Sequence, residues 1–195
     1  MFKKTVMATL LASSILSAES GGSININDKD VEVEATLDSR NLAAFQTSST
    51  LFLADANLLS SDNQKLLGLG LSANNKVEGL IGVEMSFGVK FIWAEVGAKK
   101  DNFTSVPLMA KVRYTLPPLM FNIPPVGVEA KGLYSPGSLS FGNAEGYSEF
   151  RFSGDIEMIE NVKIYAGYRN IHTKYNGLSR DLFNTGFYAG LKATY

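Results

Sequence analysis

The sequence has 195 residues, a formal net charge of −1 and no cysteine, with 45% hydrophobic and 19% charged residues. The near-neutral balance argues against a nucleic-acid-binding protein, and the composition is neither that of a disordered chain nor that of a strongly apolar one. Without cysteine the chain has neither a disulfide framework nor a lipid-modified cysteine.

The first 20 residues have the features of a secretory signal peptide. Two lysines at positions 3 and 4 form a short positive region, 6–16 is an apolar run, and Ala18-Glu19-Ser20 fits a small-x-small cleavage site. The apolar run is shorter than the roughly 20 residues that span a bilayer. No later run approaches that length, so we expect no helical anchor. The predicted organisation is a signal peptide at 1–20 and one mature domain at 21–195.

Ten segments alternate apolar and polar residues with a period of two, the pattern of a β-strand with one apolar face. The longest suits a tilted membrane strand of about 9–11 residues better than a globular strand of about 5–6. The ten segments are 24–27, 31–38, 50–59, 67–73, 81–91, 108–116, 126–134, 149–158, 162–169 and 187–195.

The last of these segments ends on an aromatic residue. Phe187, Leu191 and Tyr195 share its apolar face with two alanines. In a soluble sandwich this would be a final strand packed on a core. Outer-membrane β-barrels also end on such a strand, with an aromatic side chain at the membrane boundary. We expect these three residues to form the C-terminal assembly signal of such a barrel.

The polar faces of the segments separate a membrane barrel from a soluble one. A lipocalin-like barrel or a sandwich would turn its charged faces to water, whereas a membrane barrel turns them to its lumen and its apolar faces to lipid. Small residues on the polar faces suit a narrow interior; they are Gly68, Gly70, Gly82, Gly88, Gly127, Gly167 and Gly190. Aromatic residues near the strand ends suit interfacial girdles; they are Phe91, Trp93, Tyr114, Tyr134, Tyr168 and Tyr195. The prediction is an all-β fold, a transmembrane antiparallel up-and-down β-barrel.

The number of strands must be even if both ends of the barrel lie on the periplasmic side. Counting 24–27 and 31–38 separately gives ten strands, the number we expect. Eight is the alternative and requires two further segments to merge or drop out. With ten, the turns near Asn75 and Asn161 are periplasmic. The outward loops are then 94–105, 135–146 and 171–182, and the periplasmic connections 40–48 and 117–125 are unusually long.

The candidate site is a charge ladder inside the barrel. Its predicted members are Glu84, Lys111, Arg113, Glu129, Lys131, Glu149, Arg151, Lys163 and Arg169. The same alternation directs six more charged residues inward: Glu32, Glu34, Asp55, Lys90, Asp155 and Lys192. Barrels of about eight to ten strands hold side chains or one small ligand, and interior charges without partners would be costly. We expect a plug of ion pairs, with a narrow conducting or ligand-binding channel as the alternative.

The single histidine is the one candidate for catalysis. His172 would lie beyond the outer end of the penultimate strand, and Ser179 and Asp181 in the same loop could complete a nucleophile–base–carboxylate set. No spacing places the three on one strand face, so we expect no enzymatic activity. One histidine, no cysteine and no clustered carboxylate loop leave no metal site. Since the chain also lacks a glycine-rich phosphate loop, we expect no cofactor.

Three stretches between about 105 and 195 resemble elements of a known family. They are Tyr-Ser-Pro-Gly-Ser-Leu-Ser at 134–140, Tyr-Ala-Gly-Tyr-Arg at 165–169, and the closing Tyr-Ala-Gly-Leu-Lys-Ala-Thr-Tyr at 188–195. Their order and spacing resemble the YfaZ family of small outer-membrane β-barrel proteins. Residues 49–88 are similar in pattern only, and 21–48 depart from the family. The resemblance implies the outer membrane of a Gram-negative cell and a barrel architecture, and it implies no activity, substrate or catalytic residue.

These observations predict a precursor exported through the Sec pathway whose mature chain resides in the outer membrane as a monomer. Its expected partners are outer-membrane lipid and, during biogenesis, periplasmic chaperones and the barrel-assembly machinery. We expect no nucleic-acid partner. The expected function is of a structural or surface-interaction type, with the outward loops meeting the outside. The alternatives are a narrow porin or small-ligand transporter and, less favoured, a membrane-embedded hydrolase at His172.

Overall fold

The computed structural model describes residues 20–39, 50–61, 64–96, 101–116, 124–142, 144–175 and 181–194. The described chain is built almost entirely of strands, with one short 3-10 helix, η3 (Gly137–Leu139). Its strands are β1 (Gly21–Ile26), β2 (Asp30–Asp38), β3 (Leu51–Ser61), β4 (Gln64–Lys76), β5 (Val83–Val96), β6 (Asp101–Ser105), β7 (Leu108–Thr115), β8 (Val126–Ser135), β9 (Ser140–Gly142), β10 (Ala144–Ile159), β11 (Val162–Tyr175) and β12 (Asp181–Thr194). No helix among these residues has the length and apolarity needed to cross a membrane.

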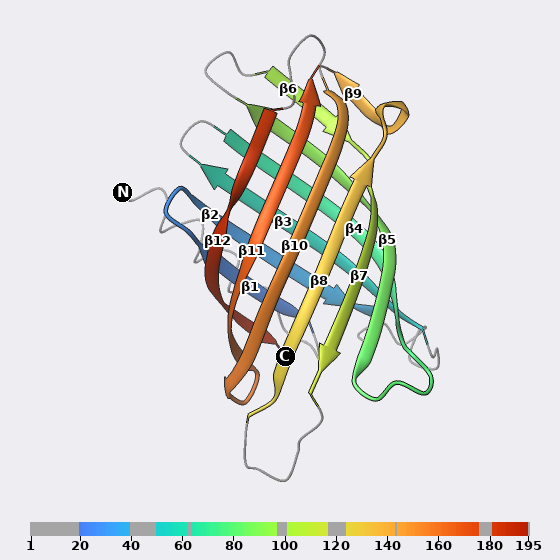
Figure 1. Cartoon of the computed structure of the whole chain (residues 1–195), viewed down its shortest axis with the longest axis vertical. Coiled ribbons are helices and arrows are strands. Elements are labelled where there is room, and N and C mark those ends of the chain that lie inside the picture. Colours follow the sequence, from blue (N-terminus) through green and yellow to red (C-terminus); the bar gives the residue numbers. More distant parts are fainter. Residues whose placement is uncertain are drawn as a thin grey trace.

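The strands form one closed antiparallel barrel (Figure 1). Apart from β6 to β9, described below, each strand pairs with the next in chain order, and β1 pairs with β12 from Gly21 opposite Thr194 to Ile26 opposite Ala189. This pairing joins the first and last strands and removes both free edges, the form in which a sheet can span lipid. The ring has ten members, because β6 and β7 occupy one place and β8 and β9 another. Ten strands are confirmed, and the alternative of eight is wrong.

The sixth and seventh members of the ring are interrupted strands. Residues of β6 and β7 pair with β5 in one continuous register, and Pro107 lies between them. Proline has no N–H to donate, so the ladder breaks there, although the Pro107 carbonyl still accepts a bond from the Lys90 N–H at 3.0 Å. Next in the ring, β8 pairs with β7 and β9 pairs with β6. The short helix η3 lies between β8 and β9 in the chain.

The stretch 134–140 that resembles the YfaZ element forms this insertion. The Leu139 N–H donates to the Pro136 carbonyl at 3.0 Å, and the Ser135 hydroxyl donates to the Leu139 carbonyl at 3.1 Å. The Ser140 hydroxyl lies 3.2 Å from that of Ser135 and donates to the Pro136 carbonyl at 3.2 Å. The proline and two serines therefore hold the short helix that re-aims the chain from β8 into β9.

The two ends of the barrel differ. One end holds both termini of the ring, the β4–β5 and β10–β11 turns and the β2–β3 and β7–β8 connections; we call it the terminal end. The other end holds β6 and β9 (Figure 1) and the remaining connections; we call it the distal end. The expected tight turn at Asn161 is present, with a φ of 67°. Of the predicted long connections at the terminal end, 40–48 and 117–123 lie outside the described residues.

The turn expected at Asn75 lies farther along the chain. Asn74 and Asn75 belong to β4, and the reversal occupies 77–82, where Gly79 and Gly82 have φ values of 82° and 80°. Positive φ is readily adopted by glycine, which explains why the chain reverses there. Gly82 therefore shapes a turn and is not part of a lumen face, which corrects its predicted role.

The outward loops are shorter than predicted. β5 continues to Val96 and β6 begins at Asp101, while β11 continues to Tyr175 and β12 begins at Asp181. The loop predicted at 135–146 contains η3, β9 and the start of β10. These strands extend because inward side chains near the distal end are apolar and pack together, as described below, so ladder pairing continues past the alternating region.

The outer face of the barrel is a belt of exposed apolar side chains. On β12, Phe187 is 80% exposed and Leu191 58%, whereas Tyr188 between them is buried. The same alternation exposes apolar residues on the other strands, among them Leu37, Phe52, Leu69, Leu71, Phe87, Val89, Leu108, Phe150, Phe152 and Ile164. Soluble monomers rarely expose apolar patches of this extent. The outside of this barrel has the surface of a protein that is solvated by lipid.

Candidate functional site

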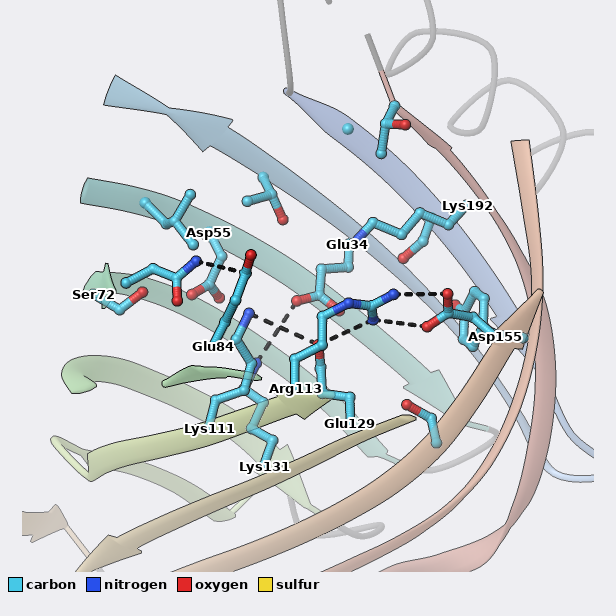
Figure 2. A pocket seen from close by; sticks show the side chains of 18 of the residues that line it. Glu34, Asp55, Ser72, Glu84, Lys111, Arg113, Glu129, Lys131, Asp155 and Lys192 are labelled. Atoms are coloured by element: carbon cyan, nitrogen blue, oxygen red, sulfur yellow. Dashed lines mark hydrogen bonds and ion pairs between the residues drawn. The ribbon is translucent and has the colours of Figure 1, made fainter. Parts of the chain in front are cut away.

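The lumen contains a cavity of about 870 Å³ that opens at the terminal end. Figure 2 shows charged side chains from several strands converging in it. Among the described residues that line it, seven are acidic and seven are basic. The cavity wall is therefore charged but close to neutral in sum.

A buried layer of ion pairs closes the cavity on its distal side. Arg151 donates two bonds to Glu32, Nη1 to Oε2 at 2.7 Å and Nη2 to Oε1 at 2.8 Å. Arg169 donates to Glu32 and to Asp30, each at 2.5 Å. Asn25 and Asn57 also donate to the Glu32 carboxylate, at 3.1 and 2.7 Å. Glu32 and Arg169 have no solvent exposure, so their charges are stabilised only by this network.

The network extends around the ring through five further contacts. Asn184 donates to Asp30 at 2.5 Å and accepts a bond from Arg169 at 3.2 Å. Glu149 accepts bonds from Arg151 and, at 2.5 Å, from the Tyr147 hydroxyl. The Arg169 guanidinium also lies 5.5 Å from the centre of the Tyr188 ring, within cation–π range. Polar groups from β1, β2, β3, β10, β11 and β12 thus meet in one layer.

Ion pairs nearer the terminal end are looser, with two exceptions. Arg113 is bidentate to Asp155 at 2.7 Å for both bonds, and Lys90 forms an ion pair with Asp55. By contrast, Lys131 lies 3.7 Å from Glu34. The remaining loose pairs are Arg113–Glu129 at 3.7 Å, Lys111–Glu129 at 3.8 Å and Lys163–Glu157 at 4.0 Å. These distances exceed hydrogen-bond length, so several charged groups on the cavity wall keep free hydrogen-bonding capacity.

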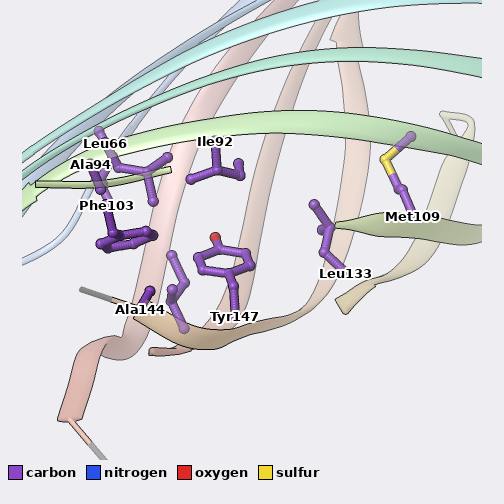
Figure 3. Packing of buried hydrophobic residues seen from close by; sticks show 10 residues of the cluster. Leu66, Ile92, Ala94, Phe103, Met109, Leu133, Ala144 and Tyr147 are labelled. Carbon is purple, nitrogen blue, oxygen red and sulfur yellow. The ribbon is translucent and has the colours of Figure 1, made fainter. Parts of the chain in front are cut away.

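Beyond the ion-pair layer, the distal lumen is filled by an apolar plug (Figure 3). It consists of Leu59, Leu66, Ile92, Ala94, Phe103, Met109, Leu133, Ala144, Tyr147 and Ile171. Leu66, Ile92, Ala94 and Ile171 are 0% exposed. A water-filled passage would expose the side chains around it. The ion-pair layer and the plug together therefore close the lumen at this level, and the cavity is blind.

All fifteen charged residues predicted to face inward do so, at different depths. Of the nine ladder members, Glu84, Lys111, Arg113, Glu129, Lys131, Arg151 and Lys163 line the cavity, and Glu149 and Arg169 lie in the ion-pair layer. Of the other six, Glu34, Asp55, Asp155 and Lys192 line the cavity. Glu32 and Lys90 are buried deeper. Four ladder members, Glu84, Lys131, Lys163 and Arg169, form no ion pair with another ladder member in the described chain.

Several residues of the site were not anticipated. Asp30 was not included in the strand at 31–38, although it shares the parity of Glu32 and Glu34 and could have been found by extending that strand by one residue. Asn25 and Asn57 lie in the predicted strands 24–27 and 50–59, but no role in the site was predicted for them. The plug was missed altogether. Its signal is a loss of alternation near strand ends, as at Leu58-Leu59, Leu66-Leu67 and Ile92-Trp93-Ala94.

His172 does not face the lumen. It lies on β11 between the buried inward residues Ile171 and Thr173, opposite Ser148. Its Nδ1 is buried and has no hydrogen-bond partner in the described chain. Ser179 and the side chain of Asp181 lie outside the described residues. No group of three or more His, Cys, Asp or Glu in the described ranges is arranged to hold a metal ion.

The fold and its lumen define a class: a closed ten-stranded β-barrel with an apolar exterior and a charged, blind interior. Within that class the chain belongs to the YfaZ family, since the family model described as YfaZ precursor matches residues 2–195. The predicted resemblance is thereby confirmed over nearly the whole chain. The match of the family model also covers residues 21–48, which were expected to depart from the family.

Two solved structures are similar to the chain at low sequence identity. One, from work on the mechanism of in-meso crystallization of membrane proteins, is 11% identical and has a TM-score of 0.44, covering 91% of this chain and 83% of its own. Another, the NanC porin in a rhombohedral crystal form, is 8% identical and has a TM-score of 0.46, covering 92% of this chain and all of its own. No curated protein matches the chain significantly.

Proposed function

We propose that the mature chain is a small integral outer-membrane β-barrel protein of a structural or surface-interaction type. The observation that carries this proposal is the exposed apolar belt around a charged interior. A lipocalin-like carrier has the reverse arrangement, with apolar side chains inside and polar ones in water. Only a lipid environment makes the observed polarity favourable.

The orientation follows from strand parity. An even number of strands places both termini at one end, which in this class of barrel is the periplasmic end. The cavity then opens to the periplasm, and the apolar plug, η3 and β9 lie toward the outside. Export through the Sec pathway, removal of residues 1–20 and delivery by chaperones to the barrel-assembly machinery belong to the same proposal.

The closed lumen favours a structural role over an open porin. Ion pairs fill the inside at the level of Glu32 and Arg169, and apolar side chains fill the level beyond. An ion would have to displace a buried network of charge-assisted bonds to pass. We therefore propose that the folded barrel does not conduct steadily.

Heat-modifiable gel mobility of the outer-membrane fraction tests membrane insertion, and planar-bilayer recording tests closure. The expected result is a mobility shift on boiling and no steady single-channel current. A chain that stays soluble in the periplasm without a shift would overturn the membrane proposal. Steady ohmic conductance from a correctly shifted protein would leave the membrane barrel standing and replace the structural role by a narrow porin.

The second candidate is a barrel that binds a small ligand, favoured by the cavity alone. A blind cavity open to one side can retain a solute without passing it. A hydrolase is not proposed. His172→Ala should leave lipid and peptide hydrolysis by the membrane fraction unchanged, and a loss of either activity would revive that alternative.

A further inference from the structure

The charges that line the cavity are sorted by wall. Acidic residues predominate on β2 to β5, where Glu34, Asp38, Asp55 and Glu84 point inward. Basic residues predominate on the opposite wall of β7 to β12: Lys111, Arg113, Lys131, Arg151, Lys163 and Lys192. The cavity therefore has an electrical polarity across its width while its total charge stays near zero.

Several exceptions to this sorting are neutralised locally. Lys90 on the acidic wall is ion-paired with Asp55. Asp155 on the basic wall is held by both terminal nitrogens of Arg113, which also lies 3.7 Å from Glu129. After these pairs are set aside, Glu84 on one wall and Lys192 on the other are among the lining charges that form no ion pair in the described chain. Lys76 on β4, the cross-strand partner of Glu84, is another.

Two ammonium groups near the mouth form a like-charged pair. Lys163 on β11 and Lys192 on β12 are direct cross-strand partners, and both line the cavity. Neither donates a hydrogen bond to any residue in the described ranges, and Lys192 has no ion pair there. Like charges directly opposite each other in a sheet destabilise it. A bound anionic group between the two would relieve that repulsion and satisfy free donors.

The matching carboxylate is Glu84 on β5. β5 and β12 lie five places apart in the ten-membered ring, so Glu84 and Lys192 belong to opposite walls, and Figure 2 shows them entering the cavity from different strands. Glu84 accepts one bond from Asn74 at 3.1 Å and forms no ion pair within the described chain. Its remaining acceptor sites are available to a cation in the cavity.

We propose that this cavity binds a small zwitterionic solute of about dipeptide size. The anionic end lies between Lys163 and Lys192, and the cationic end lies at Glu84. A dipolar solute fits because it satisfies both walls together, whereas a purely anionic or cationic one leaves one wall unmatched. This inference deepens the second candidate function, the binding of a small ligand by the barrel. It depends on membrane insertion only for the side from which the solute enters.

The test uses the full mature chain, purified from outer membranes in detergent, and ligand-observed NMR titration. The probes are glycylglycine, N-acetylglycylglycine, which lacks the ammonium group, and glycylglycinamide, which lacks the carboxylate. Glycylglycine should bind about tenfold more tightly than either analogue, since each analogue loses a charge-assisted contact. Equal binding of the three probes, or no binding of glycylglycine, would overturn the inference.

Two substitutions assign the ends of the solute. Glu84→Gln should weaken glycylglycine and glycylglycinamide several-fold and leave N-acetylglycylglycine unchanged. Lys192→Gln should weaken glycylglycine and N-acetylglycylglycine and leave glycylglycinamide unchanged. The matched controls are Glu145→Gln and Lys174→Gln, which remove an exposed ion pair outside the cavity and should change nothing. Equal effects of both cavity substitutions on all three probes would contradict the proposed orientation.

Failure here is distinguishable from failure of the membrane proposal. Each variant is first checked for heat-modifiable mobility, which reports the folded barrel independently of ligand. A protein that shifts normally but binds no probe leaves the barrel intact and removes the zwitterion site.

Discussion

Arg151 on β10 and Glu32 on β2 lie 119 residues apart in the chain and form a bidentate ion pair across the lumen. Arg169, the direct cross-strand neighbour of Arg151, donates to the same carboxylate. Two like charges on adjacent strands are therefore held by one acid on the opposite wall. This arrangement links strands that share no ladder and makes Glu32 the central residue of the ion-pair layer.

Substituting Glu32 should destabilise the barrel strongly. Glu32→Gln leaves Arg151 and Arg169 short of countercharge in a site without solvent exposure, and loss of one partner of a buried ion pair costs about 3–5 kcal/mol. Urea unfolding in detergent micelles, followed by the fluorescence of the single tryptophan, measures this change. The matched control Glu145→Gln removes an exposed carboxylate and should cost less than about 1 kcal/mol.

The Arg151–Glu32 ion pair predicts an energetic coupling between substitutions at the two residues. Glu32→Gln combined with Arg151→Gln should cost clearly less than the sum of the single substitutions, because the second change removes a charge that the first left unpaired. Strict additivity in a double-mutant cycle would show that the two residues do not depend on each other for stability.

Substitution by alanine should change the free energy of unfolding at one glycine of the barrel and leave it unchanged at another. A Cβ at Gly88 would lie 2.2 Å from the Leu71 carbonyl oxygen, so β4 and β5 would have to separate. A Cβ at Gly132 has no heavy atom within 4 Å. We expect Gly88→Ala to lower the free energy of unfolding by about 1–3 kcal/mol, as overpacking does, and Gly132→Ala to leave it unchanged. Similar unfolding midpoints for both variants would contradict the packing of β4 on β5.

The apolar belt predicts that the free-energy cost of a charged substitution depends on its depth in the membrane. Leu71 lies near the middle of β4 and is 64% exposed, whereas Ile81 lies in the β4–β5 turn. Lysine at the bilayer midplane of a barrel costs about 2–4 kcal/mol and near the interface about 0–1 kcal/mol. Leu71→Lys should therefore reduce folding into liposomes, read by heat-modifiable mobility, while Ile81→Lys folds normally. Normal folding of both variants would argue against lipid contact at Leu71.

The role of the C-terminal signal in delivery to the outer membrane can be separated from the ability of the barrel to fold. Phe187 and Leu191 lie on the exposed face of β12, and Tyr195 lies outside the described residues. A chain without Tyr195 should be depleted from the outer membrane, yet should fold in detergent after purification, since β12 still pairs with β1 through Thr194. Normal membrane levels of the truncated chain would remove Tyr195 from the signal.

Period-two alternation was enough to locate all ten members of the ring and to tell inside from outside. That information is local, because successive side chains of a strand point to opposite faces whatever the strand pairs with. The inward positions of Glu84, Arg113 and Lys192 follow from it directly. The boundaries were less well predicted, since glycine conformation at 77–82 and apolar packing near the distal end decided where strands stop.

What the sequence determined by itself is therefore the class of fold, the two faces and the near-balance of charge in the lumen. Only the tertiary structure decided which charges meet. Arg151 pairs with Glu32 across the barrel and Arg113 with Asp155 past an intervening strand, because curvature brings non-adjacent inward side chains together at distances that no linear spacing encodes. The same curvature gathers Leu66, Ile92 and Ile171 into a plug and makes the cavity blind.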